Sequence, residues 1–409
     1  SKRLSAIEKC DKTSPYYLYA KAEINLQWAF VRLKFQEYFL AAYEIQKAYF
    51  ILKENQKKFP DFHLNKKGMG LLHCLIGSIP ENYQWIVNAI GINGGIDKGL
   101  NELHQLLSLT EKDEQYKIYN TELLFLISFL EMNLTIEKSN FQKTLDAIGQ
   151  KHANHILLNF SAARLSSKLG KNDLVIKILN NRPKKEEQFE FSYLDYLLGM
   201  SYLYKLDFES SMKIFHHFIT HFKGENYIKS AYHKLAWIAF LQGEPEKKLS
   251  YFEKAIAEGS ISIDEDKVAL KDAKQNYITH PILLKGRLLY DGGYYPLALA
   301  ELQQIESPHL FSNTENTIEY WYRKARLFQK MEKPIMEVIS SFQKALDLEL
   351  TSNSYYASMS ALQIAIEYEK MGEKQKAKSY YNKCLSMKDF DYQRGIHQKA
   401  KAGLNRIAN

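Results

Sequence analysis

The sequence predicts an all-α fold in which helical hairpins stack into an α-solenoid, a right-handed superhelix. Three observations predict it. Small and large residues recur at fixed offsets, and proline and glycine number only 9 and 19 in 409 residues. No alternation typical of a β-strand persists for more than a few residues. Because stacked hairpins bury their apolar faces against one another, one solenoid can use the whole length of the chain.

The clearest hairpin lies in the middle of the chain. Leu198 and Gly199, then Tyr202, then Ser211 and Phe215 have the offsets of a tetratricopeptide repeat. In such a repeat, small residues let two helix backbones approach, and an aromatic residue of the second helix fills the remaining gap. This segment therefore predicts one complete helical hairpin.

Four further hairpins are predicted after it, so that five run from about 190 to 386 at a spacing of roughly 40 residues. Their signature residues are Tyr232, Leu235, Ala236, Gly243, Phe252 and Ala255; Gly286, Leu289, Gly293, Ala298 and Leu302; Trp321, Ala325, Phe328, Phe342 and Ala345; and Ala365, Tyr368, Gly372, Ala377 and Tyr381. One longer step is explained by an inserted helix at about 264–275. The polar stretch 393–407 is expected to cap the last hairpin.

The amino-terminal half is less regular. Hairpins are predicted at about 15–58 and around Ala162–Leu179. Apolar periodicity predicts the helices between them, at about 66–79, 81–91, 95–108, 112–132 and 139–149. We therefore expect an irregular helical half at 1–185 and a more regular solenoid at 186–409.

A glycine-rich segment carries a family resemblance. It reads Gly68-Met-Gly, then Ser78-Ile-Pro, then Gly91-Ile-Asn-Gly-Gly95 and Gly99-Leu100. This order resembles the signature of the tetratricopeptide-repeat-39 family, which includes the yeast inclusion-body clearance protein, and the run Asp291–Tyr295 is similar to that family's carboxy-terminal repeats. The resemblance implies an all-helical, non-enzymatic scaffold without a defined ligand or transferable functional residues.

The same glycines permit two structural interpretations. Gly91, Gly94, Gly95 and Gly99 allow positive φ angles and close approach of two backbones, as in a tight joint between helices. A phosphate cradle is the sharper alternative, but it needs a preceding strand and a GxGxxG or GxxxxGK[ST] pattern, which the sequence lacks. We therefore expect the joint.

Composition limits the classes of function. Basic residues exceed acidic ones by eight, but they are interleaved with Glu and Asp, whereas nucleic-acid binding favours a concentrated basic stripe. Three widely spaced cysteines argue against a disulfide framework and a zinc module. The apolar run Leu123–Leu130 is much shorter than the ~20 residues of a membrane span, so the chain is predicted to be soluble. The start at Ser1 without a methionine leans weakly toward export.

Candidate catalytic and metal sites are weak. His217 and His221 have the i, i+4 spacing of metal ligands but lack the HExxH pattern, so packing histidines are the alternative. The acidic run Asp264-Glu265-Asp266 resembles a helix start more than a calcium loop. We predict no enzymatic activity, no metal and no cofactor.

The predicted function is therefore protein binding in a concave groove lined by the first helix of each hairpin. Aromatic and arginine side chains are enriched at such surfaces. The candidate groove residues are Tyr193, Tyr196, Met200, Tyr204, His233, Trp237, Arg287, Tyr290, Tyr322, Arg323 and Arg326. For the tyrosines and Trp237, burial between repeats is an equal alternative.

The expected partner is a peptide or a segment of another protein. The alternative function is a carrier for a small apolar or lipidic ligand, in a pocket near Trp85. The sequence indicates neither the partner's identity nor the oligomeric state.

Overall fold

The computed structural model describes residues 2–79, 91–134, 138–183, 190–307, 311, 313–348 and 355–408. All regular secondary structure in these residues is helical, which confirms the predicted all-α class. The chain divides into two compact units. The first is formed by residues of Ser1–Leu169 and Asn181–Glu187, and the second by residues of Gly170–Asn180 and Gln188–Asn409.

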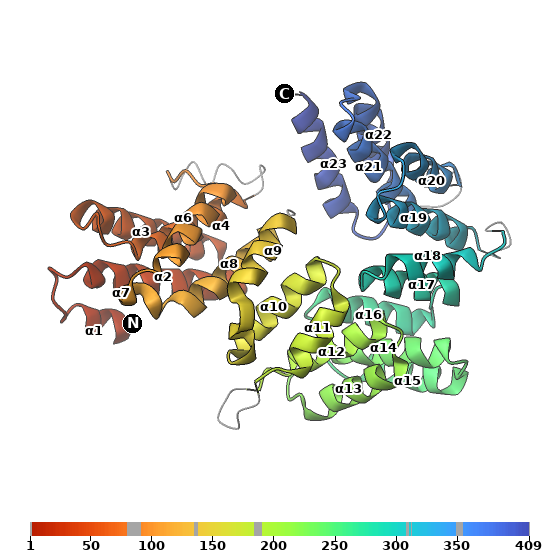
Figure 1. The fold of residues 1–409 in the computed structure, drawn as a ribbon, viewed down its shortest axis with the longest axis horizontal. Coiled ribbons are helices and arrows are strands. Elements are labelled where there is room, and N and C mark those ends of the chain that lie inside the picture. The colour runs from red at the N-terminus through yellow and green to blue at the C-terminus, as the bar shows by residue number, and fades with distance from the viewer. Residues whose placement is uncertain are drawn as a thin grey trace. The chain divides into compact units, whose positions relative to one another are not determined.

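The first unit contains a long hairpin of α2 (Pro15–Lys34) and α3 (Tyr38–Lys58), and both helices contact α4 (Asn65–Gly77) (Figure 1). Ser14 starts α2 by accepting a hydrogen bond from the backbone N–H of Tyr16 through its Oγ, at 3.3 Å. Pro15 follows at the first helical position, where no intrahelical N–H is needed. The helices of this unit are α1 (Lys2–Ile7), α2 (Pro15–Lys34), α3 (Tyr38–Lys58), α4 (Asn65–Gly77), α6 (Ile96–Leu109), α7 (Glu114–Lys117), α8 (Asn120–Leu134), α9 (Lys138–Ile148), a 3-10 helix (Gly149–Ala153) and α10 (Ile156–Lys168).

One predicted helix of this unit is wrong. The stretch 112–132 forms two helices, α7 and α8, because a side chain caps the start of α7 and a second polar contact ties the first residue of α8 to the end of α6. Asp113 accepts the N–H of Gln115 at 2.9 Å and so starts α7. Asn120, the first residue of α8, donates to Thr110 Oγ1 at 2.7 Å. The predicted helix at 81–91 lies outside the described residues except for Gly91.

The glycine-rich segment joins α4 to α6. A Cβ atom on Gly99 would lie 2.6 Å from the Sγ of Cys74 and would also collide with the carbonyl oxygen of Gly70. The backbone N–H of Gly95 donates to the carbonyl oxygen of His73 at 3.0 Å. The backbones of α4 and α6 therefore meet at van der Waals distance, as expected for a joint between helices. The N–H of Gly95 donates to a carbonyl within this joint, and so does not face a phosphate.

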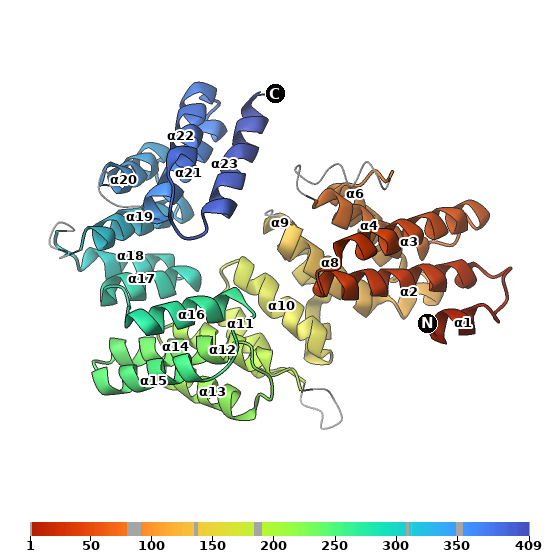
Figure 2. The same ribbon diagram turned by 180° about the vertical axis from the view of Figure 1, so that it is seen from behind.

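The second unit contains the five predicted hairpins, the inserted helix and the carboxy-terminal helix (Figures 1 and 2). Its helices are α11 (Asn172–Asn180), α12 (Tyr193–Tyr204), α13 (Phe208–His221), α14 (Ile228–Leu241), α15 (Pro245–Ala257), α16 (Asp264–Gln275), α17 (Pro281–Asp291), α18 (Tyr295–Gln303), α19 (Thr314–Lys330), α20 (Ile335–Asp347), α21 (Tyr355–Lys370), α22 (Lys374–Ser386) and α23 (Gln393–Ala408). From α11 to α16, and again from α17 to α23, each helix packs on the next one.

The packing inside a hairpin follows the predicted signature. In the α12–α13 hairpin a Cβ on Gly199 would lie only 2.9 Å from the ring of Phe215, so the missing side chain makes room for the aromatic residue. Ser211 Oγ donates to the carbonyl oxygen of Gly199 at 2.9 Å. Gly243 and Gly372 have φ angles of +74° and +77° in the turns of two later hairpins, a conformation that glycine adopts without steric cost.

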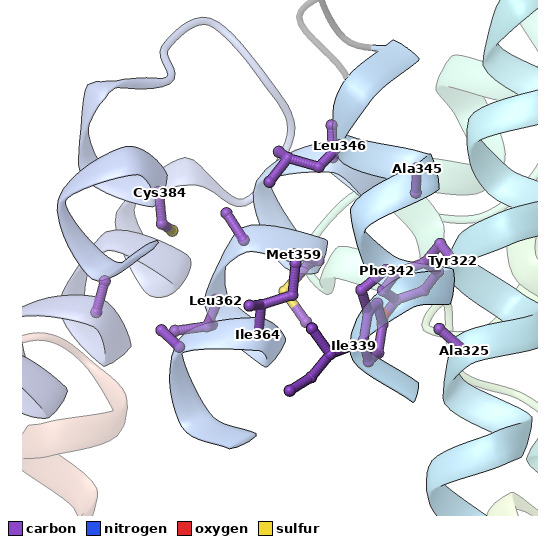
Figure 3. Packing of buried hydrophobic residues seen from close by; sticks show 14 of the residues in the cluster. Tyr322, Ala325, Ile339, Phe342, Ala345, Leu346, Met359, Leu362, Ile364 and Cys384 are labelled. Carbon is purple, nitrogen blue, oxygen red and sulfur yellow. The ribbon is translucent and has the colours of Figure 1, made fainter. Parts of the chain in front are cut away.

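The largest side chains of the last two hairpins form one core. Phe342 of α20 is fully buried and lies with Tyr322 of α19 and Met359 of α21, as Figure 3 shows. The capping helix α23 adds Ile396 and Ala400 to this core. The last hairpins thus bury their apolar faces against their neighbours, as a solenoid requires.

Helix α11 belongs to the second unit through polar contacts. Asn172 donates to the carbonyl oxygen of Ser201 at 2.7 Å, and Asp173 accepts from the Tyr294 hydroxyl at 3.0 Å. Gly293, with a φ of +84°, lets its turn approach the backbone of Gly170. The boundary between the two units therefore falls between α10 and α11, the two helices that the sequence pattern predicted as one hairpin.

Candidate binding cavity

A cavity of about 770 Å³ opens on the second unit. The first helices of three successive hairpins, α17, α19 and α21, line it together with α16 and the segment just before α23. We call it the tyrosine–arginine cavity, because its lining holds six tyrosines and three arginines. They are Tyr277, Tyr290, Tyr322, Tyr355, Tyr356, Tyr392, Arg287, Arg323 and Arg326.

Five of the eleven predicted groove residues line this cavity: Arg287, Tyr290, Tyr322, Arg323 and Arg326. They come from α17 and α19, which occupy corresponding places in neighbouring hairpins. The structure therefore brings the carboxy-terminal part of the predicted set together.

The other six lie elsewhere, mostly in the core between hairpins. Tyr196, His233 and Trp237 are buried, and the hydroxyl of Tyr196 shares a 2.8 Å hydrogen bond with Ser230 Oγ. The remaining three, Tyr193, Met200 and Tyr204, are half-buried against the same core. For these six residues the structure favours packing between repeats over display to a partner.

Arg323 is a structural cation at the base of the cavity. It forms an ion pair with Glu319, a carboxylate that is almost fully buried. Its Nη2 also donates to the hydroxyl of Tyr356 at 3.3 Å. Burial, the largest single influence, lowers the pKa of Arg323, but the charge of Glu319, the neighbouring Tyr356 and the hydrogen bond to Glu319 together outweigh it, so the pKa is raised. The ion pair lies within α19, and the hydrogen bond to Tyr356 links this helix to α21. Removing Glu319 would leave a bare buried charge on Arg323.

Arg326 has a different environment. Its Nε and Nη2 donate to the hydroxyl of Tyr290, at 3.2 and 2.9 Å, and the guanidinium carbon lies 5.8 Å from the centre of the same ring. Within the described part of the chain, no carboxylate oxygen lies within 4.0 Å of its nitrogens. A neutral hydroxyl fixes the orientation of this cation without neutralising it.

Arg287 lies on the other side of the cavity, near a stacked group of α14. Its guanidinium carbon is 5.3 Å from the centre of the Trp237 ring, and Lys234 Nζ is 3.5 Å from the same ring centre. Burial, and then the charge of Arg287, lower the pKa of Lys234 to about 7. The indole face partly opposes this, because it favours the ammonium form. Asp291 is 3.7 Å from Arg287 Nε, a loose contact for an ion pair.

Two contacts close one side of the cavity. Lys271 Nζ of α16 lies 2.7 Å from a carboxylate oxygen of Asp391, just before α23. Next to it, the ring of Tyr392 packs edge-on against Tyr355, with centroids 5.9 Å apart. The inserted helix thus becomes a wall of the cavity.

Sequence reasoning missed four of the six tyrosines. A signal for one existed, because Tyr356 follows Tyr322 by about one repeat length of 34 residues. Tyr277 and Tyr392 lie outside the hairpins, after α16 and before α23. No repeat register predicts where such residues lie.

The other candidate residues have structural roles. His221 Nδ1 contacts the carbonyl oxygen of His217 at 2.9 Å, within hydrogen-bonding distance. In the residues that the structure describes, no group of three or more His, Cys, Asp or Glu is placed to hold a metal ion. Asp266 accepts hydrogen bonds from the backbone N–H groups of Tyr227 and Ser230, at 2.7 and 2.9 Å, and so caps α14 from α16.

Across the described ranges, no helix combines the length and apolarity of a membrane span.

Comparisons with known proteins agree with the repeat assignment in one segment. Residues 360–391 match the family described as tetratricopeptide repeat. No curated protein matches the sequence significantly.

Solved structures with similarity include the TPR domain of P58(IPK), with 14% identity over 94% of this chain and 98% of that chain and a TM-score of 0.24. The APC/C hetero-tetramer Cut9–Hcn1 is 12% identical over 95% of this chain and 76% of that chain, with a TM-score of 0.31. Yeast Tom70 is 12% identical over 94% of this chain and 96% of that chain, with a TM-score of 0.28. TM-scores this low do not establish a shared arrangement of helices. The matched segment, in contrast, is the α21–α22 hairpin with the predicted Ala365, Gly372 and Tyr381, so the chain carries a tetratricopeptide repeat at residues 360–391.

Proposed function

We propose that this protein is a non-catalytic scaffold that holds a segment of another protein in the tyrosine–arginine cavity. The main support is the position of the cavity, on the first helices of three successive hairpins. Tetratricopeptide repeats generally serve as protein-interaction scaffolds, and one is present in the matched segment. The resemblance to the tetratricopeptide-repeat-39 family remains a prediction that agrees with this role.

The lining suits a peptide. Tyrosines offer large, rigid contact surfaces with a hydrogen-bonding tip, and arginines can orient carboxylate or carbonyl groups. Packing contacts and hydrogen bonds already hold several of these side chains, such as Tyr290 and Arg326. Because these side chains are ordered in advance, binding costs less conformational entropy.

The alternative of a carrier for an apolar ligand depends on a pocket near Trp85. That residue lies outside the described residues, so the alternative remains a prediction from the sequence alone. Within the described second unit, the cavity lining mixes charged and aromatic residues, which suits a polar peptide better than a lipid chain.

A charge-removing variant tests the proposal. We expect Arg287→Ala with Arg326→Ala to weaken binding of peptides selected from a random display library at least about tenfold. The melting temperature should stay close to that of the parent, since neither arginine has a close, buried carboxylate partner in the described structure. Affinities can be measured by fluorescence anisotropy of labelled peptides.

The matched control removes two positive charges away from the cavity, with Lys333→Ala and Lys378→Ala, both exposed. It should leave the affinity unchanged. If the parent enriches no peptides, or if the selected peptides bind both variants like the parent, the protein does not use this cavity as proposed.

A further inference from the structure

In the part of the chain that the structure describes, one cation of the tyrosine–arginine cavity, Arg326, has no carboxylate oxygen within 4.0 Å. Lys267 and Lys271 have carboxylate oxygens of Asp264 and Asp391 at 2.9 and 2.7 Å. The buried carboxylate of Glu319 pairs with Arg323. Among the described residues, Arg326 donates hydrogen bonds only to the neutral hydroxyl of Tyr290, through Nε and Nη2, and its Nη1 donates to no described group.

This arrangement places an oriented hydrogen-bond donor in the lining of a partly enclosed cavity. Arg326 is half-buried, and Tyr322 and Tyr355 contribute aromatic surface to the same lining. A charge removed from water without a partner is costly, and a bound anion would relieve that cost. Guanidinium groups bind carboxylates through two parallel hydrogen bonds when their N–H groups point outward.

The charge balance of the cavity limits the anion to a single negative charge. Five basic and five acidic side chains line it, so there is no general excess of positive charge. Asp291, in the same lining, would repel a second negative charge. A carboxylate therefore fits better than a doubly charged phosphate.

We infer that Arg326, held in place by Tyr290, forms a subsite for one carboxylate flanked by aromatic surface. In a bound protein segment, the carboxylate would be an acidic side chain or a chain terminus next to an apolar residue. This identification of the segment rests on the proposed function. The subsite itself does not depend on the partner being a protein.

Benzoate is a suitable probe because it joins one carboxylate to one aromatic ring. In NMR titrations of the full chain that follow the arginine Nε–Hε signals, we expect benzoate to bind saturably in the millimolar range and to shift the Arg326 signal. Benzamide, which has the same shape without the charge, should bind at least about tenfold more weakly. Inorganic phosphate should also bind more weakly than benzoate.

Variants separate charge from geometry. Arg326→Met should reduce benzoate affinity at least about tenfold, and Arg326→Lys, which keeps the charge but loses the planar fork, should reduce it less. Lys378→Met, which removes one exposed positive charge outside the cavity, is the matched control and should bind benzoate like the parent. The helical signal in circular dichroism is measured for each variant to check that it is folded.

Equal binding of benzoate and benzamide, or unchanged benzoate affinity in a folded Arg326→Met protein, would overturn the subsite. Stronger binding of phosphate than of benzoate would overturn its restriction to carboxylates. These outcomes are distinct from failure of the scaffold proposal: benzoate binding without peptide enrichment would leave the subsite standing and remove the scaffold.

Discussion

Replacing Phe342 by alanine is expected to destabilise the second unit by about 3–5 kcal/mol. Phe342 is fully buried, and its ring lies 6.0 Å from that of Tyr322 between α19 and α20. Truncation to alanine removes the apolar contacts and leaves a cavity, because helices held by neighbouring hairpins relax only partly. Figure 3 shows the surrounding side chains that would line this cavity.

Hydrogen exchange measured by mass spectrometry tests this prediction, because it reports the local opening free energy of α19, α20 and α21. Met336→Ala on the same helix is the control, since Met336 is 57% exposed and should change stability by no more than about 0.5 kcal/mol. A loss below about 1 kcal/mol for Phe342→Ala would show that the hairpins do not depend on this core.

The second large effect is expected at the α4–α6 joint of the first unit. We predict that Gly99→Ala destabilises this joint by at least about 2 kcal/mol. A single added methyl group would meet Cys74 Sγ at 2.6 Å, and it would also meet the Gly70 backbone, which cannot rotate away as a side chain can. Alanine is intrinsically the better helix residue by about 1 kcal/mol, so the sign of the result decides between clash and propensity.

Gly95 offers a matched substitution four residues away. A Cβ there would have Lys98 Cβ as its nearest neighbour, at 3.9 Å, and the φ of −175° suits any residue. Gly95→Ala should therefore be nearly neutral in the same exchange measurement on α4 and α6. If both alanine variants behave alike, close backbone approach does not explain the glycine-rich segment.

Much of the second unit could be predicted from the sequence, because its packing repeats. Gly199 and Phe215 contact each other as the repeat signature requires, and the inserted helix has the predicted ends, Asp264 and Gln275. Each hairpin packs its two helices with the same residue types at the same positions, so the position of a residue within the repeat is enough to predict its role in packing. The first unit lacks this regularity, and the break between α7 and α8 depends on local polar contacts such as Asn120 with Thr110.

The candidate site could be predicted only in part. Repeat offsets predict that both Tyr196 and Tyr290 face the groove, yet Tyr196 is buried and Tyr290 lines the cavity. The difference arises from neighbours outside the register, because Tyr227, in the loop before α14, packs on Tyr196 at 4.7 Å. The far wall of the cavity depends on Lys271 and Asp391, which are 120 residues apart. No local pattern predicts such a contact.

The most direct test reverses the charge of Arg326 and of the acidic residue in a selected peptide, and measures the affinity of each combination by calorimetry. Arg326→Glu should reject the acidic peptide and accept the same peptide with its acidic residue changed to lysine, because attraction at the subsite is then reversed. The parent should show the opposite preference. If Arg326→Glu keeps the parent's preference for the acidic peptide, the segment does not bind at this arginine and the central claim is contradicted.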